Sequence, residues 1–258
     1  MKRNKYQLSS VRNGMRILNL FKNVRNNDLG VTEIADKTGL AKSTAHRLIS
    51  TLKQEGFLSQ NPRTGKYRLG LSLLTLGGVI SVHKEIYQEA FPLVESLVKE
   101  VKETCHICLL EENKVVYYYR VKRKDPERLV TNIGRKNPVH CTGEGLAILA
   151  FQDKSYIEQV LTGELPGFTG YTITEPGKIK ERLHSIKETN YIICQDEYYL
   201  GYTSMAVPIR DYSGNVVSSL AMVGPGTRIT EQRHPYYISS LMKTAEKISE
   251  ELGYYGEV

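Results

Sequence analysis

The run from Gly30 to Gly56, GVTEIADKTGLAKSTAHRLISTLKQEG, constrains the fold most, because it predicts two short helices around a tight turn. Gly39 can supply the left-handed residue that ends the first helix. On a second helix over residues 41–55, the apolar side chains follow the i, i+3, i+4, i+7 spacing of a buried stripe: Ala45, Leu48, Ile49 and Leu52. These are the elements of a helix-turn-helix, although a plain helical hairpin has the same pattern.

The opposite face of the second helix carries hydrogen-bonding side chains and no acidic residue. Hydroxyls, an imidazole and a guanidinium can meet base edges and phosphate oxygens in a DNA groove. We therefore expect DNA contacts from Lys42, Ser43, Thr44, His46 and Arg47.

The positive charge of the chain is concentrated at one end. Residues 1–70 contain 14 Lys and Arg against 4 Asp and Glu, a net charge of +10, and the remaining residues contain 21 against 24, a net charge of −3. Basic residues that are interleaved with apolar periodicity indicate a folded module that binds a polyanion, whereas a solvated basic tail lacks such periodicity.

The segments that flank the helical pair complete a small domain. Residues 11–24 show helical spacing at Val11, Met15, Leu18 and Phe21 or Val24, which predicts a first helix. Residues 57–70, FLSQNPRTGKYRLG, predict a two-stranded hairpin with Arg63 and Lys66 at a basic tip. A hairpin after the second helix is typical of a winged helix-turn-helix, so Arg63 and Lys66 are also expected to contact DNA.

Residues 11–70, with GLAKSTAHRLISTLKQEGFL and TGKYRLG, resemble the N-terminal domain of IclR-family transcriptional regulators. The resemblance implies a winged helix joined by a linker helix to a GAF-like effector-binding domain. We expect residues 1–69 to form the DNA-binding domain and residues 70–83 the linker helix. Gly77 and Gly78 weaken that helix, and we take them as a hypothetical hinge.

Residues 84–258 predict an α+β domain with a mostly antiparallel sheet. A long amphipathic helix opens it, with Pro92 in its first turn or at a kink, and residues 106–122 predict two strands around a turn. An extended segment over 127–139, further helices and strands, and a closing helix over 236–252 follow. Helical crossovers do not alternate regularly with strands, which excludes a doubly wound fold.

This second domain also resembles the IclR family along nearly its whole length. The matching motifs include PVHCTGEG from Pro138, Asp196-Glu197 with Gly201, AVPIRD from Ala206, and Gly224-Pro225 before Arg228. The loop 140–145 precedes a helix, so its N–H groups could bind an anion, or its glycines could serve only a tight turn. By resemblance this loop lines the effector pocket and assigns Gly143 and Glu144 to it.

The remaining expected effector contacts are Cys194, Asp196, Tyr202, Ser204, Ala221 and Val223, and several of them depart from the family pattern. Cys194 stands where the family has an acid before the Asp196 motif, and Ser204 stands where a cysteine is usual. Ala221 and Val223 replace polar groups of some members, and Tyr202 can face the pocket. We expect a small organic acid or sugar acid with some apolar surface, although Glu144 would repel an anion unless it turns outward or meets a hydroxyl or cation.

Other chemistry is weakly supported. Cys105 and Cys108 would point to opposite faces of a strand, so we expect structural cysteines and no metal. No nucleophile elbow, phosphate loop or metalloprotease signature occurs, so we expect no cofactor, no catalytic residue and no enzyme. The tyrosine clusters could stack on ligands or fill the core. A nucleic-acid-docked enzyme acting on small carboxylic acids and an RNA-binding module are the rival hypotheses.

The expected protein is a one-component regulator that binds double-stranded operator DNA as a homodimer or homotetramer, because one helix-turn-helix buries little DNA surface. Both repression and activation stay open. No run of 18 apolar residues and no signal-peptide pattern occurs, so we expect a soluble, cytoplasmic protein without membrane association.

Overall fold

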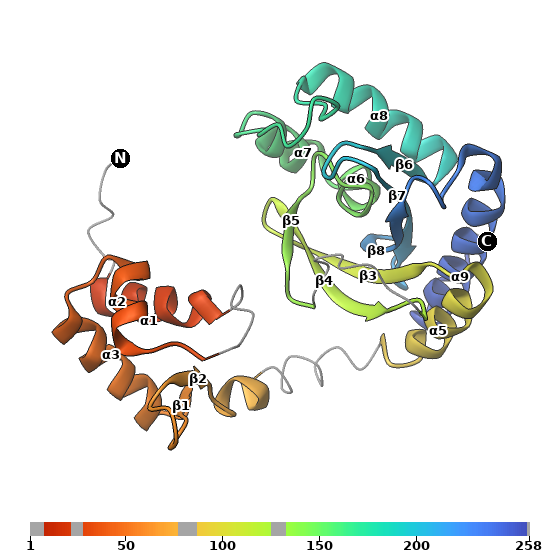
Figure 1. Cartoon of the computed structure of the whole chain (residues 1–258). Coiled ribbons are helices and arrows are strands. Elements are labelled where there is room, and N and C mark those ends of the chain that lie inside the picture. Colours follow the sequence, from red (N-terminus) through yellow and green to blue (C-terminus); the bar gives the residue numbers. More distant parts are fainter. Residues whose placement is uncertain (1–7, 22–27, 77–86, 125–132, 257–258) are drawn as a thin grey trace. The chain divides into compact units, whose positions relative to one another are not determined.

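The computed structural model describes residues 8–21, 28–76, 87–124 and 133–256, which fall into two compact units, residues 1–85 and 86–258 (Figure 1). The described residues of the first unit form the helices α1 (Ser9–Leu20), α2 (Val31–Thr38) and α3 (Lys42–Gln54), followed by a two-stranded antiparallel sheet of β1 (Leu58–Gln60) and β2 (Tyr67–Leu69). The predicted helix-turn-helix and its wing are confirmed.

The turn between α2 and α3 forms as its sequence predicts. Gly39 has a φ of 67°, and its N–H donates to the carbonyls of Ala35 and Asp36, which ends α2. Leu40 then packs partly buried against the core. The wing is tied to the helices through Leu29, which exchanges two backbone hydrogen bonds of 2.8 Å with Tyr67.

The buried face of α1 differs from the predicted one. Gly14, Ile17 and Phe21 are buried, whereas Val11 and Met15 are 55% and 52% exposed. Gly14, Ile17 and Phe21 are three or four residues apart and lie along one line on the helix, while Val11 and Met15 lie at its edge. Helical spacing alone did not distinguish the centre of the stripe from its edge.

The predicted linker helix over 70–83 is described only in its first part. Residues 72–76 are helical, and Leu71, Leu74 and Leu76 expose 79%, 72% and 52% of their surface. Gly77 and Gly78, with the hinge assigned to them, lie outside the described residues.

The second unit is built on a six-stranded sheet in the order β5-β4-β3-β8-β7-β6, in which every neighbouring pair is antiparallel. The antiparallel α+β architecture is therefore confirmed. The strands are β3 (Thr104–Glu111), β4 (Lys114–Val121), β5 (Lys136–Pro138), β6 (Ile192–Gln195), β7 (Tyr202–Arg210) and β8 (Val216–Pro225).

Helices cover both faces of this sheet (Figure 1). One face packs on α5 (Ala90–Val101) and α9 (His234–Glu251), which follows η3 (Glu231–Arg233). The other face packs on α6 (Gly143–Leu149), α7 (Lys154–Leu161) and α8 (Pro176–Thr189). Pro92 lies in the first turn of α5, as expected. None of the helices in the described ranges is long and apolar enough to cross a membrane.

Strand β3 separates the two cores. Cys105 packs on the α5 and α9 side, and Cys108 packs on the α6 side, as the alternation of a strand predicts. A register shift between Ile107 and Cys108 places Cys108 opposite Tyr117 of β4. Tyr117 therefore faces α6, and it becomes part of the site described below.

A buried histidine should make the second unit sensitive to acid. His106 on β3 is fully buried against the Tyr117 ring, and neither ring nitrogen has a hydrogen-bond partner among the described residues. Burial lowers the pKa of His106 to about 3. The unfolded chain binds this proton near pH 6.5, so the free energy of unfolding falls as the pH falls from about 6.5 towards 3.

We predict that this residue alone lowers the free energy of unfolding by about 2 kcal/mol between pH 7 and pH 5, as measured by urea unfolding. His106→Leu should lose that part of the pH dependence. His184→Leu, at a histidine whose side chain is 77% exposed, should keep it. Equal pH dependence in both variants would contradict the assignment.

Candidate functional site

The outer face of α3 is exposed and carries the polar side chains that the sequence assigned to DNA. Lys42, Ser43, Thr44, His46 and Arg47 are all exposed, while Ala45 and Ile49 on the opposite face are fully buried. The helix therefore presents a row of donors and acceptors to the solvent, and burial of its apolar face against α1 and α2 fixes that orientation.

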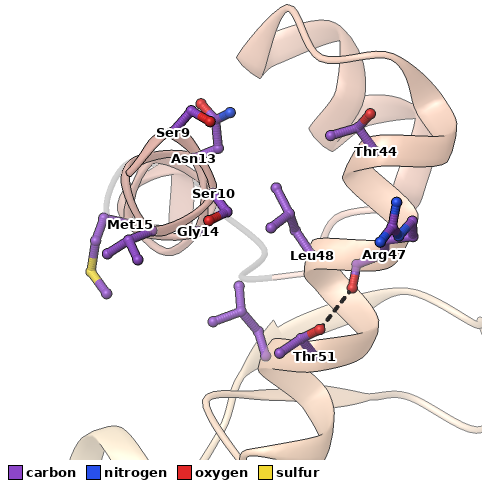
Figure 2. A pocket seen from close by; sticks show the side chains of 11 residues that line it. Ser9, Ser10, Asn13, Gly14, Met15, Thr44, Arg47, Leu48 and Thr51 are labelled. Carbon is purple, nitrogen blue, oxygen red and sulfur yellow. Dashed lines mark hydrogen bonds between the residues drawn. The ribbon is translucent and has the colours of Figure 1, made fainter. Parts of the chain in front are cut away.

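An open groove of about 570 Å³ lies between α1 and α3 (Figure 2). Leu48 points from α3 toward α1, and Thr44 and Arg47 stand along the groove. The backbone carbonyl of Arg47 accepts a hydrogen bond of 3.1 Å from Thr51. Val11 and Met15, which the α1 prediction had placed in the core, line this groove instead.

The wing tip is a structured turn. The Asn61 side-chain oxygen accepts hydrogen bonds from the N–H groups of Arg63 and Thr64, and Gly65 adopts a φ of 68°. Arg63 is exposed at this tip. Lys66 differs from the sequence expectation in one respect, because its Nζ lies 3.3 Å from Glu33 Oε2 on α2.

The second unit contains a small, partly enclosed cavity of about 30 Å³ between α6 and the end of the sheet. Five of the eight residues that the sequence assigned to an effector line it, and ten of its eleven lining residues carry a hydroxyl, thiol or carboxylate group. The lining residues are Tyr117, Cys141, Thr142, Glu144, Cys194, Glu197, Tyr198, Tyr199, Tyr202, Ser204 and Val223.

Three of the assigned residues do not line this cavity. Ala221 packs with Ala147 and Ala206 beneath α6. Asp196 has a φ of 61°, and its carboxylate accepts a hydrogen bond from the Gly201 N–H, so it shapes the turn before β7. Gly143 packs closely against Ser204, which lines the cavity.

The glycines of loop 140–145 are required by close packing and not by backbone conformation. A Cβ on Gly143 would lie 2.5 Å from Ser204 Oγ, and a Cβ on Gly145 would lie 2.5 Å from the Val139 backbone. The α6 helix has only seven residues, and the Thr142 side chain already accepts from the Gly145 N–H. The structure thus favours the packing explanation over an anion site at this helix.

Glu144 turns inward and meets two hydroxyl groups. Tyr117 donates to Glu144 Oε1 at 2.5 Å, and Ser204 donates to Oε2 at 2.9 Å. The glutamate is only 2% exposed. Of the alternatives that the sequence left open for this residue, the structure selects contact with hydroxyls.

The Tyr117 hydroxyl is oriented by further residues. Asn137 Nδ2 donates to that hydroxyl at 3.0 Å, and Arg135 Nε donates to Asn137 Oδ1 at 3.2 Å. Burial, followed by the nearby Glu144 charge, raises the pKa of Tyr117. The phenol therefore stays protonated and can donate to Glu144.

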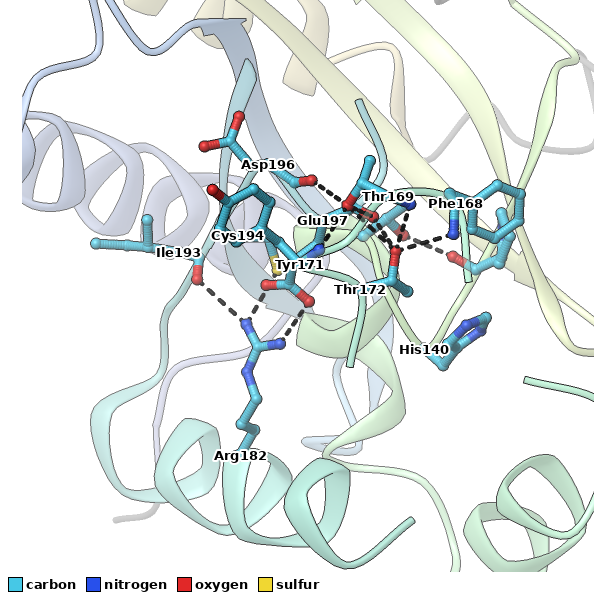
Figure 3. Close-up of polar contacts among 12 residues, drawn as sticks. His140, Phe168, Thr169, Tyr171, Thr172, Arg182, Ile193, Cys194, Asp196 and Glu197 are labelled. Atoms are coloured by element: carbon cyan, nitrogen blue, oxygen red, sulfur yellow. Dashed lines mark hydrogen bonds and ion pairs between the residues drawn. The ribbon is translucent and has the colours of Figure 1, made fainter. Parts of the chain in front are cut away.

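A second carboxylate at the cavity, that of Glu197, is held by Arg182 (Figure 3). Arg182 on α8 contacts Glu197 at 2.7 Å and also donates to Cys194 Sγ at 3.2 Å. The hydroxyls of Thr169 and Thr172 donate to the backbone carbonyls of Asp196 and Glu197, each at 2.6 Å. This network fixes the Asp196-Glu197 turn at the cavity wall.

The thiols at the cavity are poorly suited to nucleophilic chemistry. Burial raises the pKa of both Cys141 and Cys194, although Arg182 opposes the shift at each of them. A protonated thiol is a weak nucleophile, which disfavours the rival hypothesis of an enzyme that uses these cysteines. No group of three or more His, Cys, Asp or Glu among the described residues could hold a metal ion.

Sequence reasoning did not assign Tyr117, Arg182 or Glu197 to the site. Tyr117 belongs to a tyrosine cluster that fits core filling equally well, and Arg182 is one cation on a polar helix. Glu197 is part of a motif that the sequence did identify, but only its ion pair with Arg182 shows that it faces inward. These three residues come together through the tertiary structure.

Both units match known families. The family described as "IclR helix-turn-helix domain" matches residues 10–62, and "Bacterial transcriptional regulator IclR C-terminal" matches residues 79–250. The HTH-type transcriptional regulator KdgR of Escherichia coli is 31% identical over 229 residues, which cover 88% of this chain and 87% of that protein. The regulator KipR of Bacillus subtilis is 30% identical over 241 residues, with 93% and 95% covered.

Solved structures agree with this result. An IclR regulator from Alicyclobacillus acidocaldarius has a TM-score of 0.81 and 26% identity, and the match covers 96% of this chain and all of that one. An IclR homologue from Microbacterium hydrocarbonoxydans, complexed with 4-hydroxybenzoate, has a TM-score of 0.82 and 27% identity, with 95% and 99% covered.

The hydroxyl network around Glu144 gives a stability prediction. Tyr117→Phe leaves the Asn137 amide and one Glu144 oxygen without their partner, which should lower the free energy of unfolding by about 1–3 kcal/mol in urea titrations. Tyr212→Phe removes the same hydroxyl from a side chain that is 78% exposed and should cost less than about 0.5 kcal/mol. Equal decreases in the free energy of unfolding for the two variants would show that the hydrogen bonds of the Tyr117 hydroxyl add no stability.

Proposed function

The chain belongs to the IclR family of transcriptional regulators, and we propose that it binds a pseudo-palindromic operator as a homo-oligomer under the control of a small organic effector. The observation that carries this proposal is the exposed polar face of α3 beside a basic wing. The effector is assigned to the cavity beneath α6, which lies in the separate C-terminal unit. The domain limits 1–69, 70–83 and 84–258 are part of the proposal.

The proposed DNA contacts come from α3 and the wing. Exposed hydroxyls, His46 and Arg47 can reach base edges in the major groove, while Lys42 and Arg63 suit phosphate contacts. Lys66 would have to exchange its Glu33 partner for a phosphate, so we assign it a smaller contribution. Duplex DNA is favoured over RNA because a helix of this kind fits the DNA major groove.

Exposed apolar side chains in the first unit support the homo-oligomer. Val11 and Met15 on α1, together with Leu71, Leu74 and Leu76, are all more than half exposed. Side chains of this kind gather at protein interfaces. A dimer places two α3 helices on two half-sites, and it adds the DNA contact area that one domain lacks.

The effector is proposed to be a small organic molecule. The negative charge that the sequence led us to expect for it is disfavoured by the cavity. The sequence favoured an organic acid or sugar acid. Glu144 and Glu197 both line the cavity, but Glu197 is paired with Arg182, whereas the Glu144 carboxylate accepts hydrogen bonds from hydroxyls. A ligand carboxylate about 4 Å from Glu144 would be repelled by about 4 kcal/mol at an effective dielectric constant near 20. The homologue from Microbacterium hydrocarbonoxydans was solved in complex with 4-hydroxybenzoate, which supports a small organic ligand for this chain as well. The negative charge of that ligand is a property of the homologue's complex.

Regulation requires that the effector bind two conformations of the protein with different affinity. A difference of about 1–3 kcal/mol changes operator affinity by roughly 5- to 150-fold. The proposed coupling therefore needs a rearrangement of the cavity when the effector binds. The small volume of the cavity supports such a rearrangement, because a ligand must move side chains in order to enter.

Arg47 provides the sharpest test of the DNA surface. Duplexes selected from a randomised pool by the wild-type protein supply the operator, and random duplexes supply the non-specific reference. Arg47→Ala should weaken operator binding by about 1–3 kcal/mol if it reads a base, and should weaken both kinds of duplex evenly if it holds phosphate.

Lys243→Ala is the matched control, because it removes one positive charge from an exposed position of the C-terminal unit. It should leave both affinities unchanged. Operator affinity of Arg47→Ala equal to that of Lys243→Ala would remove Arg47 from the interface, and failure of the wild-type protein to select any duplex would contradict the proposed function.

A further inference from the structure

The effector cavity is too small for any organic effector in the conformation described. Its volume is about 30 Å³, whereas small-molecule sites usually have about 300 Å³ or more. Side chains of the chain itself occupy the space. A ligand must displace at least one of them.

Glu144 is the side chain that fills the cavity in the manner of a ligand. It is 2% exposed, and its two carboxylate oxygens each accept a hydrogen bond from a different strand, from Tyr117 on β4 and from Ser204 on β7. Ser219 on β8 donates to the Glu144 backbone carbonyl at 3.0 Å. Three strands thus hold one residue in place.

The donors around this carboxylate are aligned in one direction. Arg135 donates to Asn137, Asn137 donates to Tyr117, and Tyr117 donates to Glu144. Ser204 donates from the other side. This series of hydrogen bonds ends at the Glu144 carboxylate, and donors directed at a carboxylate in this way stabilise its negative charge.

Both arginines near the cavity already have hydrogen-bond partners. Arg182 is engaged by Glu197, and the second guanidinium nitrogen of Arg135 donates to the Tyr199 hydroxyl. None of the described residues that line the cavity is Lys, Arg or His. A carboxylate ligand would therefore meet the Glu144 carboxylate with no cation among the described lining residues to balance the two charges.

We propose that Glu144 occupies the place of a ligand carboxylate and so makes this cavity selective for uncharged, hydroxyl-bearing effectors. This inference rests on the proposed function, because it concerns the effector of the same regulator. The ligand hydroxyls would donate to Glu144 in exchange for the Tyr117 and Ser204 hydroxyls. The rings of Tyr198, Tyr199 and Tyr202 suit the apolar faces of a sugar, a polyol or a phenol.

The test uses two matched pairs of probes that differ in charge and little in shape: 4-hydroxybenzoate with 4-hydroxybenzamide, and lactate with lactamide. Dissociation constants for the full-length protein are measured by titration calorimetry and by ligand-observed NMR at millimolar concentrations. The quantity compared is the ratio of the carboxylate constant to the amide constant, in the wild type and in Glu144→Ala.

The wild type should bind each amide at least tenfold more tightly than its carboxylate. In Glu144→Ala the vacated space and the two free hydroxyls should reverse this preference, so the ratio should fall by at least 100-fold. Glu144→Gln, which keeps the size and removes the charge, should bring the ratio towards one. Glu158→Ala removes a carboxylate from an exposed pair with Lys180 and should leave the ratio at the wild-type value.

Wild-type protein that binds either carboxylate as tightly as its amide would overturn the proposal. Absence of carboxylate binding by Glu144→Ala would overturn it as well, provided that the circular dichroism spectrum of this variant matches that of the wild type. If the spectra differ, Glu144→Gln decides: a ratio that stays at the wild-type value would overturn the proposal. Operator selection by the wild-type protein is independent of these titrations, so failure of the proposed function would be recognised separately.

Discussion

The C-terminal unit depends on the close approach of α6 to the sheet. Ala147 of α6 packs on Ala206 and Ala221, and the space behind Gly143 admits no side chain, because Ser204 lies there. Larger residues at these positions would lift the helix and open the core. This close contact carries Glu144, one residue after Gly143, into the interior of the domain, where a carboxylate is stable only with hydrogen-bond donors around it.

Those donors connect folding with recognition. Tyr117 reaches Glu144 because the irregularity in the β3–β4 pairing sets it opposite Cys108, and Ser204 reaches it from β7. On the other wall, Arg182 holds Glu197 beside Cys194. A ligand that replaces the bonds of Glu144 would disturb β4, β7 and α6 together. Such a rearrangement is the kind of two-state element that coupling to DNA affinity requires.

Much of the fold could be predicted from the sequence, because local patterns determine it. Gly39 and the apolar stripe of α3 fixed the helix-turn-helix, and the alternation around Cys105 and Cys108 assigned the faces of β3. Helical spacing was less informative where it allowed more than one buried face, because Val11 and Met15 of α1 fit the spacing but are exposed. The cavity was predicted only in part, since Glu144 and Ser204 lie in recognisable motifs, while the partners Tyr117 and Arg182 are brought in by strand register and helix packing.

The most direct test of the central claim is a crystal structure of Glu144→Ala grown with 4-hydroxybenzoate. We predict that the carboxylate of the ligand lies where the Glu144 carboxylate lies in the wild type, and that it accepts hydrogen bonds from Tyr117 and Ser204. Water in that space with the ligand absent, or a ligand bound elsewhere in the domain, would contradict the claim that Glu144 holds the place of an anion.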